Sequence, residues 1–153
     1  MTLSAEQFVR VEFFGTLDEL NVALGEAHRL ADCKATADII DGMQGVVLDL
    51  TNADTSNLKT WAEKLRALSG SLRAAGYWGE DFIRIGGTHL AVALHECRVR
   101  ARKAGRWGKQ WEGCGDERTD VLFLIGHVCY SLAIKMNNGL ERYHAHSKSL
   151  DLG

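Results

Sequence analysis

The sequence predicts an all-α fold, a five-helix up-and-down bundle that forms one domain over residues 1–153. Two observations support this prediction. The chain contains no proline among its 153 residues, whereas the many tight turns of a β-sandwich or barrel usually include some. Apolar residues, which make up 46% of the chain, recur at spacings of three and four in five segments. At about 1.5 Å per residue, such helices are long enough to pack side by side around one core.

The first helix is expected to begin at Thr16, because Thr16 and Glu19 have the spacing of a capping box. The apolar residues that follow share one helix face: Leu17, Leu20, Leu24 and Ala27. A second helix is predicted over residues 36–50 and a third over residues 57–75, each with a similar apolar stripe. The polar residues 52–57 between them predict a loop.

Thr88 is predicted to cap the fourth helix. A glycine-rich break follows that helix, and the fifth helix is expected to begin at Asp116 or Thr119. The two ends of the chain, residues 1–9 and 140–153, carry no sustained apolar periodicity, and we expect them to be flexible.

Composition and charge exclude several classes of protein. The formal net charge of −2 excludes a globally basic nucleic-acid binder. The N-terminal residues lack the basic and apolar regions of a signal peptide. Apolar stretches are interrupted by Asp49, His127 or Lys135 before they reach the roughly 18 residues that a membrane helix needs. Membrane association is therefore not expected.

The cysteines and histidines predict a cytoplasmic protein without a metal site. No CxxC pair occurs among the four cysteines, which are Cys33, Cys97, Cys114 and Cys129. Free thiols in a reducing compartment are the expected state for such a chain. His144 and His146 are two residues apart, a spacing that does not place them on one helix face, so we expect no metal there.

The fourth predicted helix carries six basic residues and no acid between residues 98 and 109. Arg98, Arg102 and Arg106 are spaced four apart and share one face. Such a row predicts an anionic partner, which can be a neighbouring carboxylate, a nucleotide or a nucleic acid. A solvated basic face explains the same pattern, and the sequence leaves both interpretations open.

Two longer motifs resemble segments of a known protein family and occur in the same order. Residues 10–21 read RVEFFGTLDELN and resemble the RVEAYGTxDELN segment of PduO-type ATP:cob(I)alamin adenosyltransferases. Residues 82–98 read FIRIGGTHLAVALHECR and are similar to that family's FILPGGTxLAxALHxAR. The likeness spans roughly residues 10–135, in the same order and with fitting spacing.

The resemblance implies a cobalamin adenosyltransferase-like helical bundle that assembles as a homotrimer with ligand sites between subunits. In this family the cobalt of cob(I)alamin attacks the 5′ carbon of ATP, and triphosphate leaves. Phe82 matches the phenylalanine that covers the lower face of the corrinoid. Asp18 and Arg98 match a salt bridge between subunits. Arg102 matches an arginine on the ATP phosphates, and Lys103 and Arg98 are further candidates for binding a nucleotide or another anion.

Departures from the family pattern fall on its nucleotide-binding half. Residues 102–106 read RKAGR where the family has RRAER, so Lys103 replaces an arginine and Gly105 replaces a glutamate. Lysine lacks the planar fork that binds phosphate in a bidentate way. The residues before Arg10 contain no glycine and no lysine, whereas the family has a phosphate-wrapping loop there. Since losing one preorganised donor costs about 2.7–4 kcal/mol of transition-state stabilisation, we expect adenosyl transfer to be weak or lost, and we do not expect ATP and magnesium to bind as they do in the family.

Three single residues have plain alternatives to a functional role. His95 follows the family motif, but we interpret it as a histidine of the core or an interface rather than a proton shuttle. His127 lies where the family often has an arginine, so it is either a weaker anion contact or a partly buried polar residue. Trp78 can line a pocket or anchor its loop.

The favoured hypothesis is a trimer that binds a corrinoid, or another flat hydrophobic or anionic small molecule, with adenosyl transfer weak or lost. One alternative is an active ATP:cob(I)alamin adenosyltransferase, and the sequence leaves its catalytic residues unassigned. Another is a binding module that uses the basic fourth helix for an anionic partner. Cobalamin is the expected ligand in the first two cases, and nucleic acid is the least expected partner.

Overall fold

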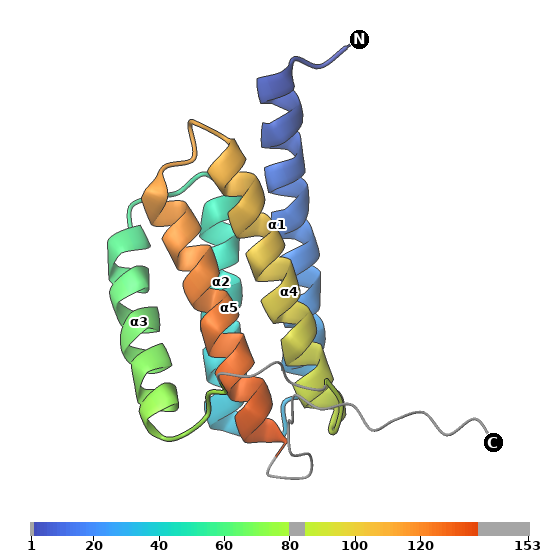
Figure 1. Cartoon of the computed structure of the whole chain (residues 1–153), viewed down its shortest axis with the longest axis vertical. Helices are drawn as coiled ribbons and strands as arrows, with labels where there is room; N and C mark the ends of the chain where they lie inside the picture. Colours follow the sequence, from blue (N-terminus) through green and yellow to red (C-terminus); the bar gives the residue numbers. More distant parts are fainter. Residues whose placement is uncertain (1, 80–84, 138–153) are drawn as a thin grey trace, which may run out of the picture.

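A computed structural model describes residues 2–79 and 85–137 of the chain. These residues form five helices, α1 (Ala5–Leu30), α2 (Lys34–Thr51), α3 (Leu58–Ala74), α4 (His89–Gln110) and α5 (Asp116–Met136), and the predicted all-α bundle is confirmed (Figure 1). The loop predicted between the second and third helices lies between α2 and α3. Phe82, His144 and His146 lie outside the described residues.

The first helix begins at Ala5, so the prediction that it begins at Thr16 is wrong. Ser4 is the N-cap, and it forms a reciprocal capping box with Gln7: the Gln7 N–H donates to Ser4 Oγ (3.2 Å), and the Ser4 N–H donates to Gln7 Oε1 (2.9 Å). Residues 5–9, for which flexibility was the expectation, are helical. Thr16 is buried in the middle of α1, where its hydroxyl donates to the Phe13 carbonyl at 2.6 Å.

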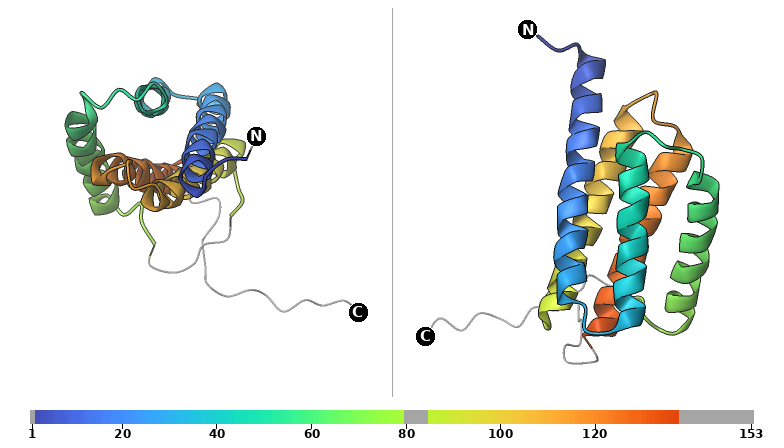
Figure 2. Two further views of the ribbon diagram at one scale, coloured as in Figure 1. Left: turned by 90° about the horizontal axis from the view of Figure 1, so that it is seen from above. Right: turned by 180° about the vertical axis from the view of Figure 1, so that it is seen from behind.

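The five helices enclose one apolar core. In Figure 2, in the view from behind, the helix α2 lies in front of α4 and α5, with α1 on one side and α3 on the other. The helix α4 packs against both α1 and α5, while α3 packs against α5, and α2 packs mainly against α1. The largest fully buried side chains come from all five helices: Phe13, Leu17, Leu20, Leu24, Ile40, Met43, Leu50, Leu58, Leu94, Leu122, Ile125 and Leu132. The helices α4 and α5 therefore lie at the centre of the bundle, each packed against at least two other helices.

The last helix corrects one expectation about composition. Among the described helices, α5 alone is long and apolar enough to cross a membrane by these two criteria. The expectation failed because the interruptions at His127 and Lys135 are too few to lower its mean hydropathy. More than half of the apolar window, 56%, is buried inside the bundle, so α5 has the placement of a core helix.

Candidate functional site

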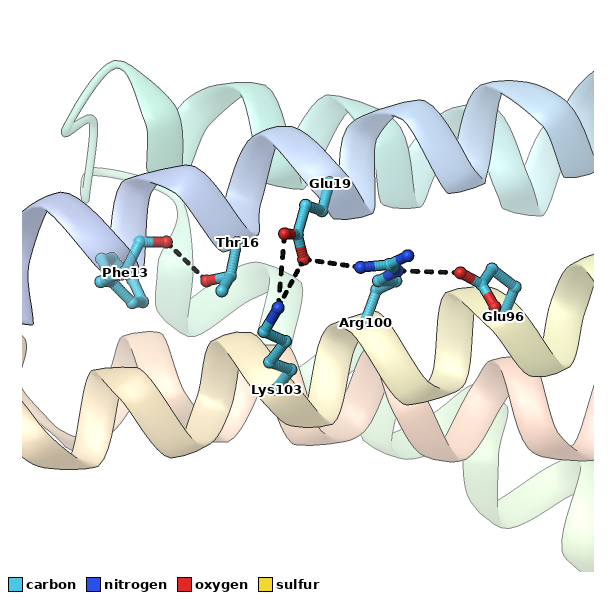
Figure 3. Close-up of polar contacts among 6 residues, drawn as sticks. All are labelled: Phe13, Thr16, Glu19, Glu96, Arg100 and Lys103. Carbon is cyan, nitrogen blue, oxygen red and sulfur yellow. Dashed lines mark hydrogen bonds and ion pairs between the residues drawn. The ribbon is translucent and has the colours of Figure 1, made fainter.

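The basic residues of α4 divide between two sides of the helix. Arg100 and Lys103 lie next to α1, where Glu19 contacts both (Figure 3). Arg100 Nη1 is 2.8 Å and Lys103 Nζ is 3.1 Å from Glu19 Oε2, and Arg100 Nε donates to Glu96 Oε1 at 2.8 Å. The hydrogen bond from Lys103, and then that from Arg100, lowers the pKa of the Glu19 carboxyl, although partial burial opposes the shift. Glu19 is therefore the carboxylate partner of these two cations, and it does not belong to a capping box.

A groove of about 500 Å³ lies between α1 and α4 beside this network. Four carboxylates line it, those of Asp18, Glu19, Glu26 and Glu96, together with Arg100 and the apolar side chains of Val22 and Ala23. Asp18 is exposed here. The groove is therefore acidic at its edges and apolar in part of its lining.

A second set of cations lies on the side of α4 that faces α5. We define the Arg–aromatic cluster as Arg73 of α3, Trp78, Arg98 and Arg102 of α4, and His127 and Tyr130 of α5. Trp78 is its centre: the Trp78 ring centroid lies 4.8 Å from that of Tyr130 and 5.6 Å from that of His127. Arg73 Cζ is 4.8 Å from the Trp78 ring centroid. Three helices and the segment after α3 thus contribute to one cluster.

Among the described residues, the two arginines of α4 in this cluster have no acidic partner. In residues 2–79 and 85–137, no carboxylate forms an ion pair with Arg98, Arg102 or Arg73. The Nε atom of Arg98 is buried without a hydrogen-bond partner, and its Cζ lies 5.9 Å from the Tyr130 ring centroid. An anion placed here would compensate these guanidinium charges.

The pKa shifts in this region have the same origin. Burial, with the positive charge of Arg102, lowers the pKa of the Arg98 guanidinium. Burial lowers the pKa of His127, and Arg102 and Arg73 add to the effect. Burial and then Arg98 lower the pKa of His95 to about 4, so this side chain is neutral at physiological pH. A surplus of positive charge in a desolvated setting is therefore the electrostatic character of the cluster.

The structure separates the residues that the sequence singles out. Asp18 lines the groove beside α1, whereas Arg98 lies on the side of α4 that faces α5, and the two form no ion pair within one chain. Lys103 is held by Glu19, while Arg102 is exposed and has no such partner. Arg98 and Arg102 of the predicted row thus form no ion pair with a described carboxylate, whereas Glu19 binds Arg100 and Lys103 on the side of α4 that lies next to α1.

The helices α4 and α5 approach each other closely at Gly105. A Cβ atom at this position would lie 2.7 Å from Phe123 Cζ and 2.8 Å from Phe123 Cε1. The Phe123 ring therefore occupies the space next to Gly105 that a side chain would need. Nothing in the local sequence of α4 signals this contact, because Phe123 comes from the next helix.

Sequence reasoning missed Arg73 and Tyr130 as members of the cluster. Arg73 lies in the last turn of α3 and Tyr130 in the buried helix α5, and neither belongs to a recognisable motif. The one usable signal was the Tyr77–Trp78 pair after α3, since two adjacent aromatic residues in a loop indicate packing against a neighbour. Among the described residues, no three His, Cys, Asp or Glu side chains gather in the way that a metal site requires.

Comparison with known proteins gives a consistent result. The model of a family described as cobalamin adenosyltransferase matches residues 3–115, which is more than half of the chain. No curated protein matches the sequence significantly.

Two solved structures match most of the chain. Both are variants of a PduO-type ATP:corrinoid adenosyltransferase from Lactobacillus reuteri, complexed with cobalamin and ATP, in which a phenylalanine is changed to alanine or to histidine. Each has a TM-score of 0.74 and 22% sequence identity, and the match covers 92% or 95% of this chain and 87% of the other. At this identity, the likeness shows a shared fold.

Proposed function

Because the chain belongs to the cobalamin adenosyltransferase family, we propose that it is a corrinoid-binding homotrimer in which ATP-dependent adenosyl transfer is weak or lost. The division of the basic residues of α4 is the observation that supports this proposal. Glu19 neutralises Lys103 and shares Arg100 with Glu96, so the chain's own carboxylates engage these two cations. Arg102 is left as an exposed cation without a carboxylate partner in the described part of the chain.

Corrinoid binding is supported by the chemistry of the Arg–aromatic cluster. Cobalamin combines a large flat ring with a phosphate in its nucleotide tail. Trp78 and Tyr130 offer aromatic surface, and Arg98 and Arg102 offer charge for an anionic group. The structures that share this fold contain cobalamin and ATP. Phe82, by its family resemblance, is the residue proposed to cover the lower face of the corrinoid.

Weak adenosyl transfer follows from the loss of groups that stabilise triphosphate as it leaves. That leaving group carries several negative charges, and losing one preorganised donor costs about 2.7–4 kcal/mol of transition-state stabilisation. Lys103 keeps its charge but is bound to Glu19. The glutamate that the family places at position 105 is absent, and Phe123 fills the adjoining space. We therefore expect ATP to bind weakly and to react slowly.

Trimer formation is supported by two complementary surfaces. The groove beside α1 carries four carboxylates, whereas the Arg–aromatic cluster carries cations that no carboxylate in residues 2–79 and 85–137 pairs with. Val11 and Val22 are 55% and 74% exposed and share the outer side of α1 with Asp18. Because the acidic and basic surfaces lie on different sides of one chain, contact between copies would be head-to-tail, which is the type of contact that forms a ring when the rotation between copies closes. In the proposed assembly, Asp18 of one copy pairs with Arg98 of the next.

Product formation tests the enzymatic part of the proposal. The protein is mixed with chemically reduced cob(I)alamin and ATP, and adenosylcobalamin is followed by its sensitivity to light. We expect product at the uncatalysed rate or only a few-fold above it. Product formed many orders of magnitude faster than the uncatalysed rate would reject this part of the proposal and would establish the alternative, an active ATP:cob(I)alamin adenosyltransferase. That alternative is favoured by one observation: Arg102 is exposed and forms no ion pair with any residue that the structure describes.

A further inference from the structure

Three side chains that can carry positive charge gather around the ring of Trp78. Arg73 Cζ lies 4.8 Å from the Trp78 ring centroid, and the His127 ring lies 5.6 Å from it, edge to face at an angle of 85°. Arg102 is close enough for its charge to act on His127. Because α5 packs against both α4 and α3, three adjacent helices bring these groups to one surface (Figure 1). We call these four residues the Trp78 surface.

No carboxylate compensates the arginines of this surface in the part of the chain that the structure describes. Arg73 and Arg102 are exposed and form no ion pair there. No residue three or four positions along the chain from Arg73, Arg102 or His127 is acidic, so their own helices supply no partner either. On the opposite side of α4, by contrast, Arg100 is paired with Glu19. The positive charge of the Trp78 surface is therefore available to a ligand.

His127 is the group of this surface whose charge changes near neutral pH. Partial burial of the ring, and then the charges of Arg102 and Arg73, lower its pKa, so the ring is neutral at physiological pH. The aromatic neighbours add no charge, since Trp78 does not titrate and burial raises the pKa of the Tyr130 hydroxyl. An anion bound among these groups would offset the two arginines and raise the pKa of His127. The ring would then gain a proton as the anion binds.

We propose that the Trp78 surface binds a phosphate or sulfate group and that His127 takes up a proton when this group binds. The two guanidinium groups supply charge-assisted hydrogen bonds, and the protonated imidazole adds a further donor. Tyr130 packs on the indole at 4.8 Å and holds the centre of the surface in place. Arg98 takes no part, so its proposed pair with Asp18 of another copy is compatible with this site. The inference rests on the proposed function only in treating the Arg–aromatic cluster as a ligand site.

Sulfate is the probe for this proposal, because it stays doubly charged between pH 5.5 and pH 7.5 and any change must come from the protein. Calorimetric titration at constant ionic strength, with chloride as the reference anion, measures the affinity at both pH values. NMR titration of the ring protons measures the pKa of His127 with and without sulfate. The variants are His127→Asn, which cannot titrate, His127→Arg, which keeps a permanent charge, and Arg73→Gln. His28→Asn is the matched control, because His28 is exposed on α1, outside this surface.

We expect the wild type and His28→Asn to bind sulfate several-fold more tightly at pH 5.5 than at pH 7.5, with a limit of about tenfold per pH unit for uptake of one proton. Sulfate should raise the pKa of His127. His127→Asn should lose most of this pH dependence, His127→Arg should bind tightly at both pH values, and Arg73→Gln should bind weakly at both. The same pH dependence in His127→Asn as in the wild type, or no preference for sulfate over chloride, would overturn the proposal.

A second probe distinguishes two sources of the bound group. Dimethyl phosphate carries one charge, as the phosphodiester in the cobalamin tail does, whereas sulfate stands for a free dianion. Proton uptake with both probes would assign the site to the corrinoid tail, and uptake with sulfate alone would assign it to a free anion. A cob(II)alamin spectrum that the wild type leaves unchanged would reject the corrinoid function and would leave the sulfate result standing, so the two failures are distinguishable.

Discussion

The contact between Gly105 and Phe123 permits a prediction whose magnitude follows from two opposing effects. Replacing a glycine inside a helix by alanine normally stabilises the helix by about 1 kcal/mol. At Gly105 the new methyl group would lie 2.7 Å from Phe123 Cζ, so the ring has to move out of its packed position. Overpacking of this kind costs about 1–3 kcal/mol. We therefore expect Gly105→Ala to lower the free energy of unfolding by about 0–2 kcal/mol.

The same substitution should have the opposite sign when the ring is absent. In a Phe123→Ala background, Gly105→Ala has no clash to relieve and should raise the free energy of unfolding by about 1 kcal/mol. The coupling energy between the two sites is then about 1–3 kcal/mol, as expected for residues in direct contact. Gly70 is the matched control, because it lies within α3 and a Cβ there would meet nothing within 4 Å.

Urea denaturation of the four Gly105 and Phe123 combinations, and of Gly70→Ala in both backgrounds, measures these values. Gly70→Ala should stabilise both backgrounds equally. A Gly105–Phe123 coupling energy below about 0.5 kcal/mol would refute the reasoning, since independent sites add to within that margin. It would also remove the argument that Phe123 replaces the side chain that the family carries at position 105.

Three further predictions concern charge. The pKa of His95 is lowered to about 4 in the folded state, so its contribution to stability is present at neutral pH and is lost as the pH falls below the unfolded value of about 6.5. Between pH 7 and pH 5, the free energy of unfolding should therefore fall by about 2 kcal/mol more in the wild type than in His95→Gln. Urea denaturation at both pH values measures this difference. An equal loss in both proteins would contradict this. In calorimetric titration at low salt, inorganic triphosphate should bind more weakly to Arg102→Ala than to Lys103→Ala, because Lys103 already forms an ion pair with Glu19. The reverse order would show that Lys103 is the available cation. Asp18→Ala should shift sedimentation toward smaller species, and an unchanged sedimentation profile would exclude this carboxylate from the proposed interface.

The helices and the core could be predicted because local patterns specify them. The spacing of Leu17, Leu20 and Leu24 indicates a buried face whichever helix lies opposite, and all three are 0% exposed. The predicted start of α1 was wrong because two pairs of residues, Ser4 with Gln7 and Thr16 with Glu19, have the spacing of a capping box. Only the first pair is preceded by non-helical backbone. Thr16 and Glu19 lie inside a continuous helix, where the same side chains form other contacts.

The candidate site was predicted only in part, because it depends on which helices are neighbours. The sequence indicates a row of cations on α4 but cannot show that Glu19 of α1 neutralises Lys103. Likewise, the contact of Phe123 with Gly105 and that of Asn137 with Gly87 join segments that are distant in the chain. Such contacts follow from the packing of α1, α4 and α5 and are not encoded in any local motif.

The absorbance spectrum of cob(II)alamin mixed with the protein, recorded with and without ATP, tests the central claim most directly. The proposed site binds the corrinoid and has lost most of its affinity for polyphosphate. We therefore predict the spectral change expected when the lower ligand leaves cobalt, with the same amplitude in both samples. A change that occurs only when ATP is present, or no change in either sample, would contradict the account.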